Sequence, residues 1–315
     1  MKNRMFLLTA IIIFCLCFST NAFANELNVI TNLDPVEPPA EENLKRANVA
    51  VYDEYDLYNG LRAQSTDALR AKGYTQEDIQ SIKSTPYETL LRQRGELSVE
   101  DLKNYGYNDE QIAILKNPDS TDAELLRASS KITMKTVIEK LDYHTNHYTY
   151  STVYLEWKWA PIPNSLYTDD AAIAWTGGMT FMSYSENNKS RYTLWKRNSA
   201  TGTEKMKTTP LTQNNYVQLG RAVQIPEFHL SEYASGSTSP AGPSGSQNYT
   251  VKGAARVALK YYGRLSSLEA QGAYAHYSVR VSGISISVPW SVSISFSKSP
   301  YDVYRRNDYR TVREL

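Results

Sequence analysis

Apolar residues and serines alternate along the stretch SGISISVPWSVSISFS, residues 282–297. Successive side chains of a β-strand point to opposite faces of the sheet, so this period of two predicts a strand over 284–296 with one apolar face and one face of small hydroxyls. The apolar positions are Ile284, Ile286, Val288, Trp290, Val292, Ile294 and Phe296. The preceding apolar residues have the opposite phase, and a bulge or tight turn is expected at Gly283, where the register changes.

Three interpretations of this strand are open. A core strand of an antiparallel sheet, buried on one face, accounts for the pattern and is the interpretation that we favour. The inserting hairpin of a pore-forming protein shows the same alternation, with about 9–11 residues crossing the bilayer, but the chain offers no evident partner strand with matching serines. The nearest segment, AYAHYSVRV, carries His276 and Arg280. A strand at the edge of a sheet could also pair with a second copy of itself.

Residues 46–141 show helical patterns and contain an internal repeat. The segment LRAKGYTQEDIQSIK begins at Leu69, and LKNYGYNDEQIAILK begins at Leu102, 33 residues later. In each copy a glycine stands where one helix is expected to end, and the residue after the following tyrosine is a helix N-cap, Thr75 or Asn108. The N-cap and the residue three positions on are expected to form a capping box that starts the next helix.

A further helix is expected to begin after Thr121 and to run towards Leu141. Downstream, short alternating runs rich in Tyr, Thr, Val, Ser and Trp predict roughly eight strands. The Ser-, Gly- and Pro-rich segment 234–247 is predicted to be a flexible loop. The chain is therefore predicted to be an α+β protein, with a helical region carrying a duplicated helix pair at 46–141 and an all-β antiparallel sandwich at 142–315.

The first 24 residues have the pattern of a secretory signal peptide. A basic start is followed by the apolar run MFLLTAIIIFCLCF and by small residues at Ala22 and Ala24. The run is shorter than the roughly 20 apolar residues of a membrane-spanning helix. Residues 1–24 are thus predicted to be removed on export, ahead of a disordered acidic and proline-rich lead-in at 25–45.

The cysteines, the charge and the histidines exclude several chemistries. Cys15 and Cys17 are the only cysteines and lie in the predicted signal peptide, so the exported chain is expected to have no disulfide and no cysteine nucleophile. With 34 basic and 33 acidic residues, the chain lacks the concentrated positive charge of a nucleic-acid-binding protein. His144 and His147 have no third ligand at a metal-site spacing. No catalytic motif is found, and we expect no enzyme activity, no metal and no cofactor.

Carboxylates leave one catalytic alternative open. A glycoside hydrolase needs two carboxylates that face each other across a cleft, and the sequence cannot pair the available acids. In the segment TDD, residues 168–170, the two aspartates are expected to lie in a turn before the strand AAIAW.

Tryptophans in predicted strands are the best candidates for a binding site. They are Trp157, Trp159, Trp175 and Trp290. Core packing is the default for such rings because they bury large areas, and the alternative is an exposed face that stacks on sugar rings. Trp157 and Trp159 are two residues apart and would share one face of a strand.

These patterns together lead to two expected functions. The first is a secreted or cell-wall-associated, non-catalytic binding protein of a Gram-positive-type bacterium. It would bind a cell-wall glycan or a surface protein through aromatic strand surfaces and the helical repeat, and it would not bind nucleic acid. The second is a secreted membrane-active or pore-forming protein that uses the amphipathic strand 284–296, and only this alternative implies contact with a membrane.

Overall fold

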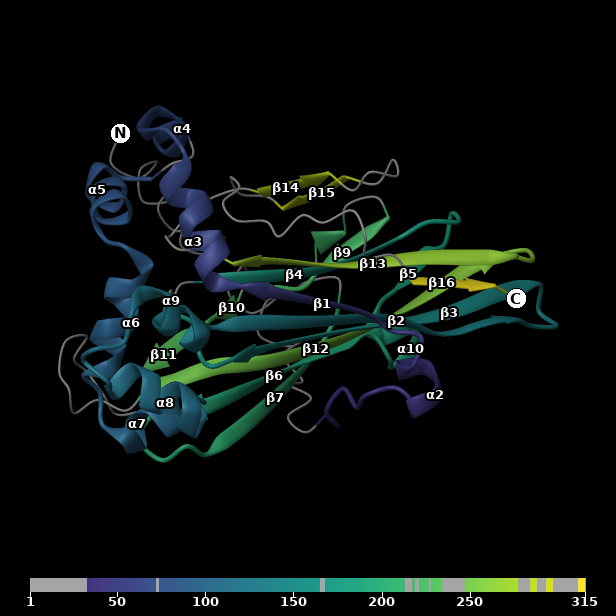
Figure 1. The fold of residues 1–315 in the computed structure, drawn as a ribbon. Coiled ribbons are helices and arrows are strands. Elements are labelled where there is room, and N and C mark those ends of the chain that lie inside the picture. Colours follow the sequence, from purple (N-terminus) through teal and green to yellow (C-terminus); the bar gives the residue numbers. More distant parts are fainter. Residues whose placement is uncertain are drawn as a thin grey trace, which may run out of the picture. The chain divides into compact units, whose positions relative to one another are not determined.

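A computed structural model describes residues 33–71, 74–164, 168–212, 217–218, 221–226, 228–233, 247–276, 284–287, 293–296 and 311–314. The chain divides into two units, Met1–Asp34 and Pro35–Leu315, and the elements below belong to the second. The described residues combine helices with antiparallel sheets, which confirms the mixed α+β class (Figure 1).

The helices are short and nearly all of them precede the second strand. Within the described residues they are α2 (Glu41–Leu44), α3 (Glu54–Ala63), α4 (Thr66–Ala71), α5 (Gln76–Ser84), α6 (Tyr87–Gly95), α7 (Val99–Asn104), α8 (Asp109–Lys116), α9 (Asp122–Leu125) and α10 (Tyr184–Asn187). Short helices leave a large share of their backbone groups without a partner inside the helix, and a side-chain cap marks the start of α3, α5, α7, α8 and α9.

The two corners of the sequence repeat are capped as the sequence predicts. α5 begins after Thr75, whose hydroxyl accepts a hydrogen bond from the backbone N–H of Asp78, while the Asp78 carboxylate accepts one from the N–H of Thr75. α8 begins after Asn108 with the same reciprocal pair, made with Gln111. Between α7 and α8, Gly106 has the left-handed φ of 88° that favours glycine at a helix end. The corresponding glycine of the first copy lies outside the described residues.

The segment predicted to extend the helix after Thr121 is a strand instead. α9 ends at Leu125, a 3-10 turn follows, and β2 (Lys131–Tyr143) begins soon after. Alternate side chains from Ile132 to Thr136 are buried, which is the period of a half-buried strand. β1 (Asn48–Asp53), also in the predicted helical region, pairs with β2. Strand partners on both sides of β2 outweigh the helical spacing of its later apolar residues.

The remaining strands form two larger sheets and one small one. They are β3 (Tyr148–Ala160), β4 (Thr168–Trp175), β5 (Thr180–Met182), β6 (Arg191–Asn198), β7 (Glu204–Pro210), β8 (Val217–Gln218), β9 (Ala222–Gln224), β10 (Phe228–His229), β11 (Ser231–Tyr233), β12 (Gln247–Tyr262), β13 (Ser267–His276), β14 (Ile284–Ser287), β15 (Ser293–Phe296) and β16 (Thr311–Glu314). The first sheet has the order β1-β2-β3-β12-β6-β7, and β5 and β11 also pair with β12. The second has the order β16-β13-β4-β9-β8, with β10 beside β4.

One hydrophobic cluster takes buried side chains from both larger sheets. Leu155 on β3 and Val257 on β12 belong to it, as does Ile173 on β4, and all three are fully buried. On the same strands Trp157 lies opposite Gly253, and its ring fills the space that a Cβ atom at position 253 would need. The two long strands approach this closely because position 253 has no side chain.

The end of α7 contacts the first sheet where β6 ends and β12 begins (Figure 1). The side-chain amide of Asn104 donates to the carbonyl of Ser199 at 3.0 Å. The hydroxyl of Tyr105 bonds to that of Tyr249 at 2.6 Å. The corner after α7 is therefore attached directly to the sheet.

The lead-in predicted to be disordered, 25–45, packs against the first sheet in its described part. Val36 is 1% exposed, and its N–H donates to the hydroxyl of Thr193 at 2.8 Å. The carbonyl of Glu37 accepts a hydrogen bond from Arg256 at 2.9 Å. The composition is misleading here because one buried apolar residue and a few backbone hydrogen bonds are enough to fix an extended segment on a sheet.

The stretch predicted as one strand over 284–296 is two strands. β14 and β15 pair antiparallel, with Ile286 opposite Ile294 and Ser285 opposite Ser295. Pro289, halfway along the stretch, has no N–H to donate to a strand ladder, which disfavours one continuous strand. The bulge expected at Gly283 lies outside the described residues, and so does the loop expected at 234–247 apart from Gln247, which begins β12.

Glu156 on β3 is a partly buried carboxylate between two lysines. It lies 2.9 Å from Lys252 Nζ and 3.6 Å from Lys135 Nζ, and it accepts a hydrogen bond of 2.9 Å from the hydroxyl of Tyr154. Burial alone raises the pKa of Glu156, but the lysines and the hydroxyl together outweigh burial and hold that pKa below its usual value.

Glu156→Gln is expected to lower the free energy of unfolding by about 1.5–3 kcal/mol at pH 7, the usual range for hydrogen bonds to a charged group. Because the folded-state pKa lies below that of the unfolded chain, this contribution is complete above the usual glutamate pKa and is lost as the pH falls through the folded value. Urea unfolding at pH 7 and at about pH 3 measures it. The difference in free energy of unfolding between wild type and variant should shrink at the lower pH.

The exposed control Glu100→Gln should show little change in this free energy at either pH. An equal loss at both pH values would mean that ionised Glu156 does not stabilise the fold.

Candidate functional site

Three of the four candidate tryptophans lie in the core. Trp157, Trp159 and Trp175 are 1%, 2% and 1% exposed. The ring of Trp157 stacks on that of Phe228 with 5.5 Å between centroids. These positions confirm the core-packing interpretation and correct the alternative of an exposed aromatic face built from these residues, because rings this large are most stable between the sheets. Trp290 lies outside the described residues.

Buried polar groups surround one of these rings. The indole N–H of Trp159 donates to the hydroxyl of Tyr274 at 3.1 Å, and that hydroxyl donates to the carboxylate of Asp169. The Nδ1 atom of His276 lies 3.0 Å from the same carboxylate. Asp169 is part of β4, so the expected turn at 168–170 is wrong. All four residues are at most 3% exposed, and we assign the network to the stability of the core.

An exposed aromatic surface does exist, but tyrosines form it. It lies where β2 turns into β3 and beside the end of β12. The rings of Tyr148 and Tyr262 meet edge to face with centroids 5.3 Å apart, and those of Tyr148 and Tyr150 are 6.1 Å apart. Tyr262 is 71% exposed and Tyr143 is 42% exposed. The alternation of Tyr148 and Tyr150 in the sequence could have pointed to this surface, which we call the tyrosine tip.

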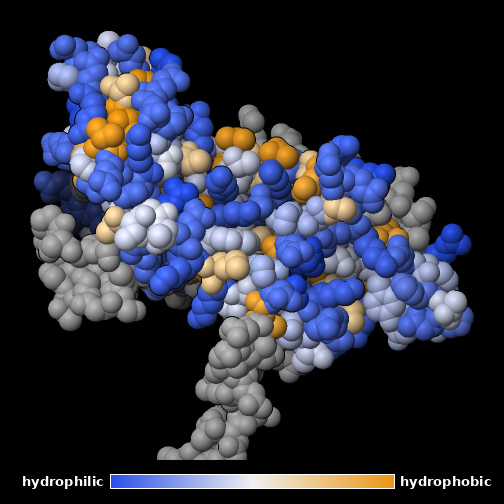
Figure 2. All heavy atoms as spheres, turned by 90° about the horizontal axis from the view of Figure 1, so that it is seen from below, coloured by the Kyte–Doolittle hydropathy of each residue, from blue (hydrophilic) through white to orange (hydrophobic). Residues whose placement is uncertain are grey.

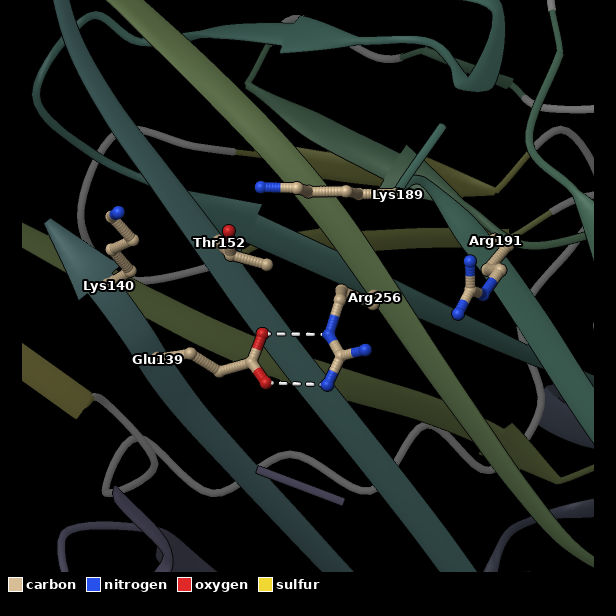
Figure 3. A pocket seen from close by; sticks show the side chains of 6 residues that line it. All are labelled: Glu139, Lys140, Thr152, Lys189, Arg191 and Arg256. Carbon is tan, nitrogen blue, oxygen red and sulfur yellow. Dashed lines mark hydrogen bonds and ion pairs between the residues drawn. The ribbon is translucent and has the colours of Figure 1, made fainter. Parts of the chain in front are cut away.

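A second surface feature is a basic pocket on the first sheet (Figure 3). Its cavity has a volume of about 340 Å³. The residues that line it are Glu139, Lys140, Thr152, Lys189, Arg191 and Arg256. They come from four neighbouring strands and from the segment before β6, so far-separated parts of the sequence meet here.

The pocket contains one carboxylate, which a β-bulge positions. The register of β2 with β3 shifts between Ile138 and Lys140, which leaves Glu139 as the extra residue. Glu139 reaches past β3 and accepts two hydrogen bonds from Arg256 on β12, 2.8 Å from Nε and 2.7 Å from Nη2. Such a two-point pair fixes the plane of the guanidinium group. Figure 3 shows Arg256 between Glu139 and Arg191.

The other cations of the pocket are less constrained. Lys140 forms an ion pair with Asp142, which follows it by two residues on β2. In the described part of the chain, Arg191 donates two long hydrogen bonds, 3.3 Å to the carbonyl of Asn188 and 3.5 Å to that of Pro35. Among the described residues, neither Lys189 nor Arg191 forms an ion pair. The pocket therefore has a strong excess of positive charge.

No sequence pattern predicts this pocket, because its residues lie up to 117 positions apart. The only local signal is the pair Lys189 and Arg191, which are two residues apart and bracket the start of β6. Pairs of that kind are common on solvated surfaces, so the pattern alone carries no functional weight.

In the part of the chain that the structure describes, no three residues among His, Cys, Asp and Glu are grouped closely enough to hold a metal ion. Among the described helices, none combines the length and the hydropathy of a membrane-spanning segment. On the face seen in Figure 2, hydrophobic residues form small separate groups in a mainly hydrophilic surface.

Comparisons with known proteins identify no family. No protein-family model matches the chain, and no curated protein matches it. Among solved structures, the chain is similar to the delta-toxin of Clostridium perfringens, with 10% sequence identity, a TM-score of 0.19, and coverage of 48% of this chain and 78% of the toxin chain. A likeness at that level is too low to assign a fold or a function.

Proposed function

We propose that this chain is a secreted, membrane-active protein that inserts the β14–β15 hairpin into a lipid bilayer. The observation that carries the proposal is the register of the hairpin, in which apolar positions pair with apolar positions and serines pair with serines. A hairpin with this pairing has one apolar side and one hydroxyl side. That division matches what a strand at a boundary between lipid and water requires.

The register also removes the main objection that the sequence raised. Considered as one strand, 284–296 lacks a partner with matching serines. Folded as β14 and β15, the two halves of the stretch are partners of each other. Ile284 pairs with Phe296 at one end, and Ser287 pairs with Ser293 at the other.

The length of the hairpin limits how deep it can reach. Each arm of the described hairpin has four residues, which span about 13 Å at the rise of a strand, whereas the hydrocarbon core of a bilayer is about 30 Å thick. An inserted hairpin that crosses the bilayer must therefore recruit flanking residues on both sides. The apolar residues of the segment 277–283 alternate in the opposite phase to those of 284–296. To extend the inserted strand with its apolar residues on the same side, this segment would have to pair without the shift of register expected at Gly283.

Fluorophore scanning tests the insertion directly. The exported chain is expected to have no cysteine, so one cysteine at a time can be placed at positions 284–287 and 293–296 and labelled with an environment-sensitive dye. Added vesicles of phosphatidylcholine and phosphatidylglycerol should raise the fluorescence at the even positions and leave the odd positions near their values in water, together with release of a trapped dye. Labels at positions 280 and 298 report whether the flanking segments follow.

A uniform fluorescence change along the hairpin, or no change with intact vesicles, would falsify the proposal. Insertion that stops at positions 284 and 296 while the vesicles still leak would restrict the hairpin to one leaflet.

The second candidate function is binding to a cell-wall glycan, and the tyrosine tip favours it. The exposed Tyr262 and the half-buried Tyr148 beside it carry rings and hydroxyls of the kind that stack on sugars and bond to their hydroxyls. Sedimentation with purified cell wall, without leakage of vesicles, would support this candidate over membrane insertion. Loss of sedimentation in Tyr262→Ala would place the binding at the tip.

The finer features of the fold are part of the proposal as well. We take the two larger sheets as the layers of the predicted sandwich, which the shared hydrophobic cluster supports. We take the corners before α5 and α8 as copies of one duplicated helix pair, which their matching capping boxes support.

A further inference from the structure

We infer that the basic pocket binds a phosphate group. The pocket lies on the described first sheet, so binding there does not depend on insertion of the hairpin. The charges of its lining, one buried donor and the size of the cavity all fit a phosphate.

The charges of the pocket favour an anion. Its lining contributes four cationic side chains and one carboxylate. The carboxylate of Glu139 is committed to Arg256, and Lys140 has Asp142 as a partner. Lys189 and Arg191 have no carboxylate partner among the described residues, so a dianion between them would be attracted without displacing an existing ion pair.

A buried donor points to a specific acceptor. The Nε atom of Arg191 is buried and has no hydrogen-bond partner among the described residues. A buried N–H group without an acceptor is unfavourable, and buried donors of this kind are usually satisfied by protein, water or a ligand. An oxyanion in the pocket would supply the acceptor. Because a guanidinium group presents a planar set of donors, phosphate oxygens fit it at two points.

Arg256 is already oriented for a second contact. Glu139 holds Nε and Nη2, and the carbonyl of Glu37 accepts a further bond from Nη2. The Nη1 atom is thus on the side away from the carboxylate, towards Arg191 (Figure 3). A group that is fixed before the ligand arrives loses little conformational entropy on binding.

The volume suits a phosphate that carries a substituent. A cavity of about 340 Å³ is much larger than one phosphate ion and lies in the range of sites for small organic ligands. Free phosphate esters and the headgroups of phospholipids share this chemistry, and the experiment has to separate them.

Inorganic phosphate is the first probe, used with the full chain in solution and without vesicles. Isothermal titration should show saturable binding in the wild type. Arg191→Gln should weaken that binding at least about 10-fold, as expected for loss of a charge-assisted two-point contact, and the exposed Lys189→Gln should weaken it about 3-fold. Lys158→Gln removes an equal charge from the exposed side of β3, outside the pocket, and should leave binding unchanged within about 2-fold.

Thermal unfolding of each variant shows whether it is folded. If Arg191→Gln does not fold, Lys189→Gln still tests the binding.

Vesicles separate the two sources of phosphate. The variant Ile286→Lys/Ile294→Lys, in which hairpin insertion should fail, is mixed with vesicles that contain phosphatidylglycerol. The pocket is unchanged in this variant and can still bind the vesicles. If Lys189→Gln weakens that vesicle binding and inorganic phosphate competes with it, the ligand is a lipid headgroup. Phosphate binding without any such vesicle binding would identify a soluble phosphate ester. The inference is overturned if wild type shows no saturable binding up to about 10 mM phosphate, or if Lys158→Gln weakens binding as much as Lys189→Gln does.

Discussion

Lysine at both Ile286 and Ile294 is expected to abolish vesicle leakage. These residues are paired across the hairpin, and in the proposed inserted state they lie on the lipid side. A lysine on the lipid side of a membrane strand costs about 2–4 kcal/mol near the bilayer centre. Two of them cost at least about 4 kcal/mol, which lowers an insertion equilibrium about 1,000-fold. Release of a trapped dye, followed against protein concentration, measures the loss.

The matched control is Ser285→Lys/Ser295→Lys. Ser285 and Ser295 form the neighbouring pair of the same hairpin, so this variant carries the same added charge and the same repulsion between opposed lysines. Its lysines lie on the side proposed to face water, and leakage should be retained within about three-fold. Equal loss in both variants would mean that charge, rather than a lipid-facing side, governs the activity, and the proposed insertion would be withdrawn.

Gly253→Ala is expected to destabilise the fold by about 3 kcal/mol, at the upper end for overpacking a core. A Cβ atom at this position would overlap the ring of Trp157, which is fully buried and stacked on Phe228. Neither the ring nor the β12 backbone can move without disturbing the pairing of β3 with β12. Urea unfolding, monitored by tryptophan fluorescence, measures the change.

Two comparisons isolate the cause of that loss. Gly60→Ala, in α3, introduces the same methyl group where nothing lies within 4 Å, and it should stabilise the chain by about 0.5–1 kcal/mol through its helix propensity. In a Trp157→Phe background, Gly253→Ala should cost at least about 1 kcal/mol less, because the smaller ring leaves space. An undiminished cost there would assign the loss to the backbone of β12.

Local features of this chain could be predicted well from the sequence. The caps at Thr75 and Asn108 depend on residues three positions apart, and the structure has both. The later apolar residues of β2 fit a helical spacing as well as a strand, so the sequence predicts a helix where the structure has β2. What decides its state is pairing with β1, whose partner residues lie 78 to 88 positions earlier, and with β3.

Long-range features could not be predicted. The orientation of Trp157 depends on Gly253, 96 residues away, and on which face of β3 meets the second sheet. The basic pocket depends on a bulge at Glu139 and on an arginine two strands away. At the hairpin, the alternation correctly identified strand residues, but it is the same for one long strand and for two that fold back on each other.

The packing of Val36 makes the length of the N-terminus relevant to the pocket. The two carbonyls beside this buried residue, those of Pro35 and Glu37, accept hydrogen bonds from the pocket arginines Arg191 and Arg256. A protease that removed the chain up to and including Glu37 would take away both acceptors. It would also expose the apolar side chains of Val137, Tyr154 and Ala254, against which Val36 packs. Proteolytic maturation would then raise the affinity of the pocket for an anion without altering any residue that lines it.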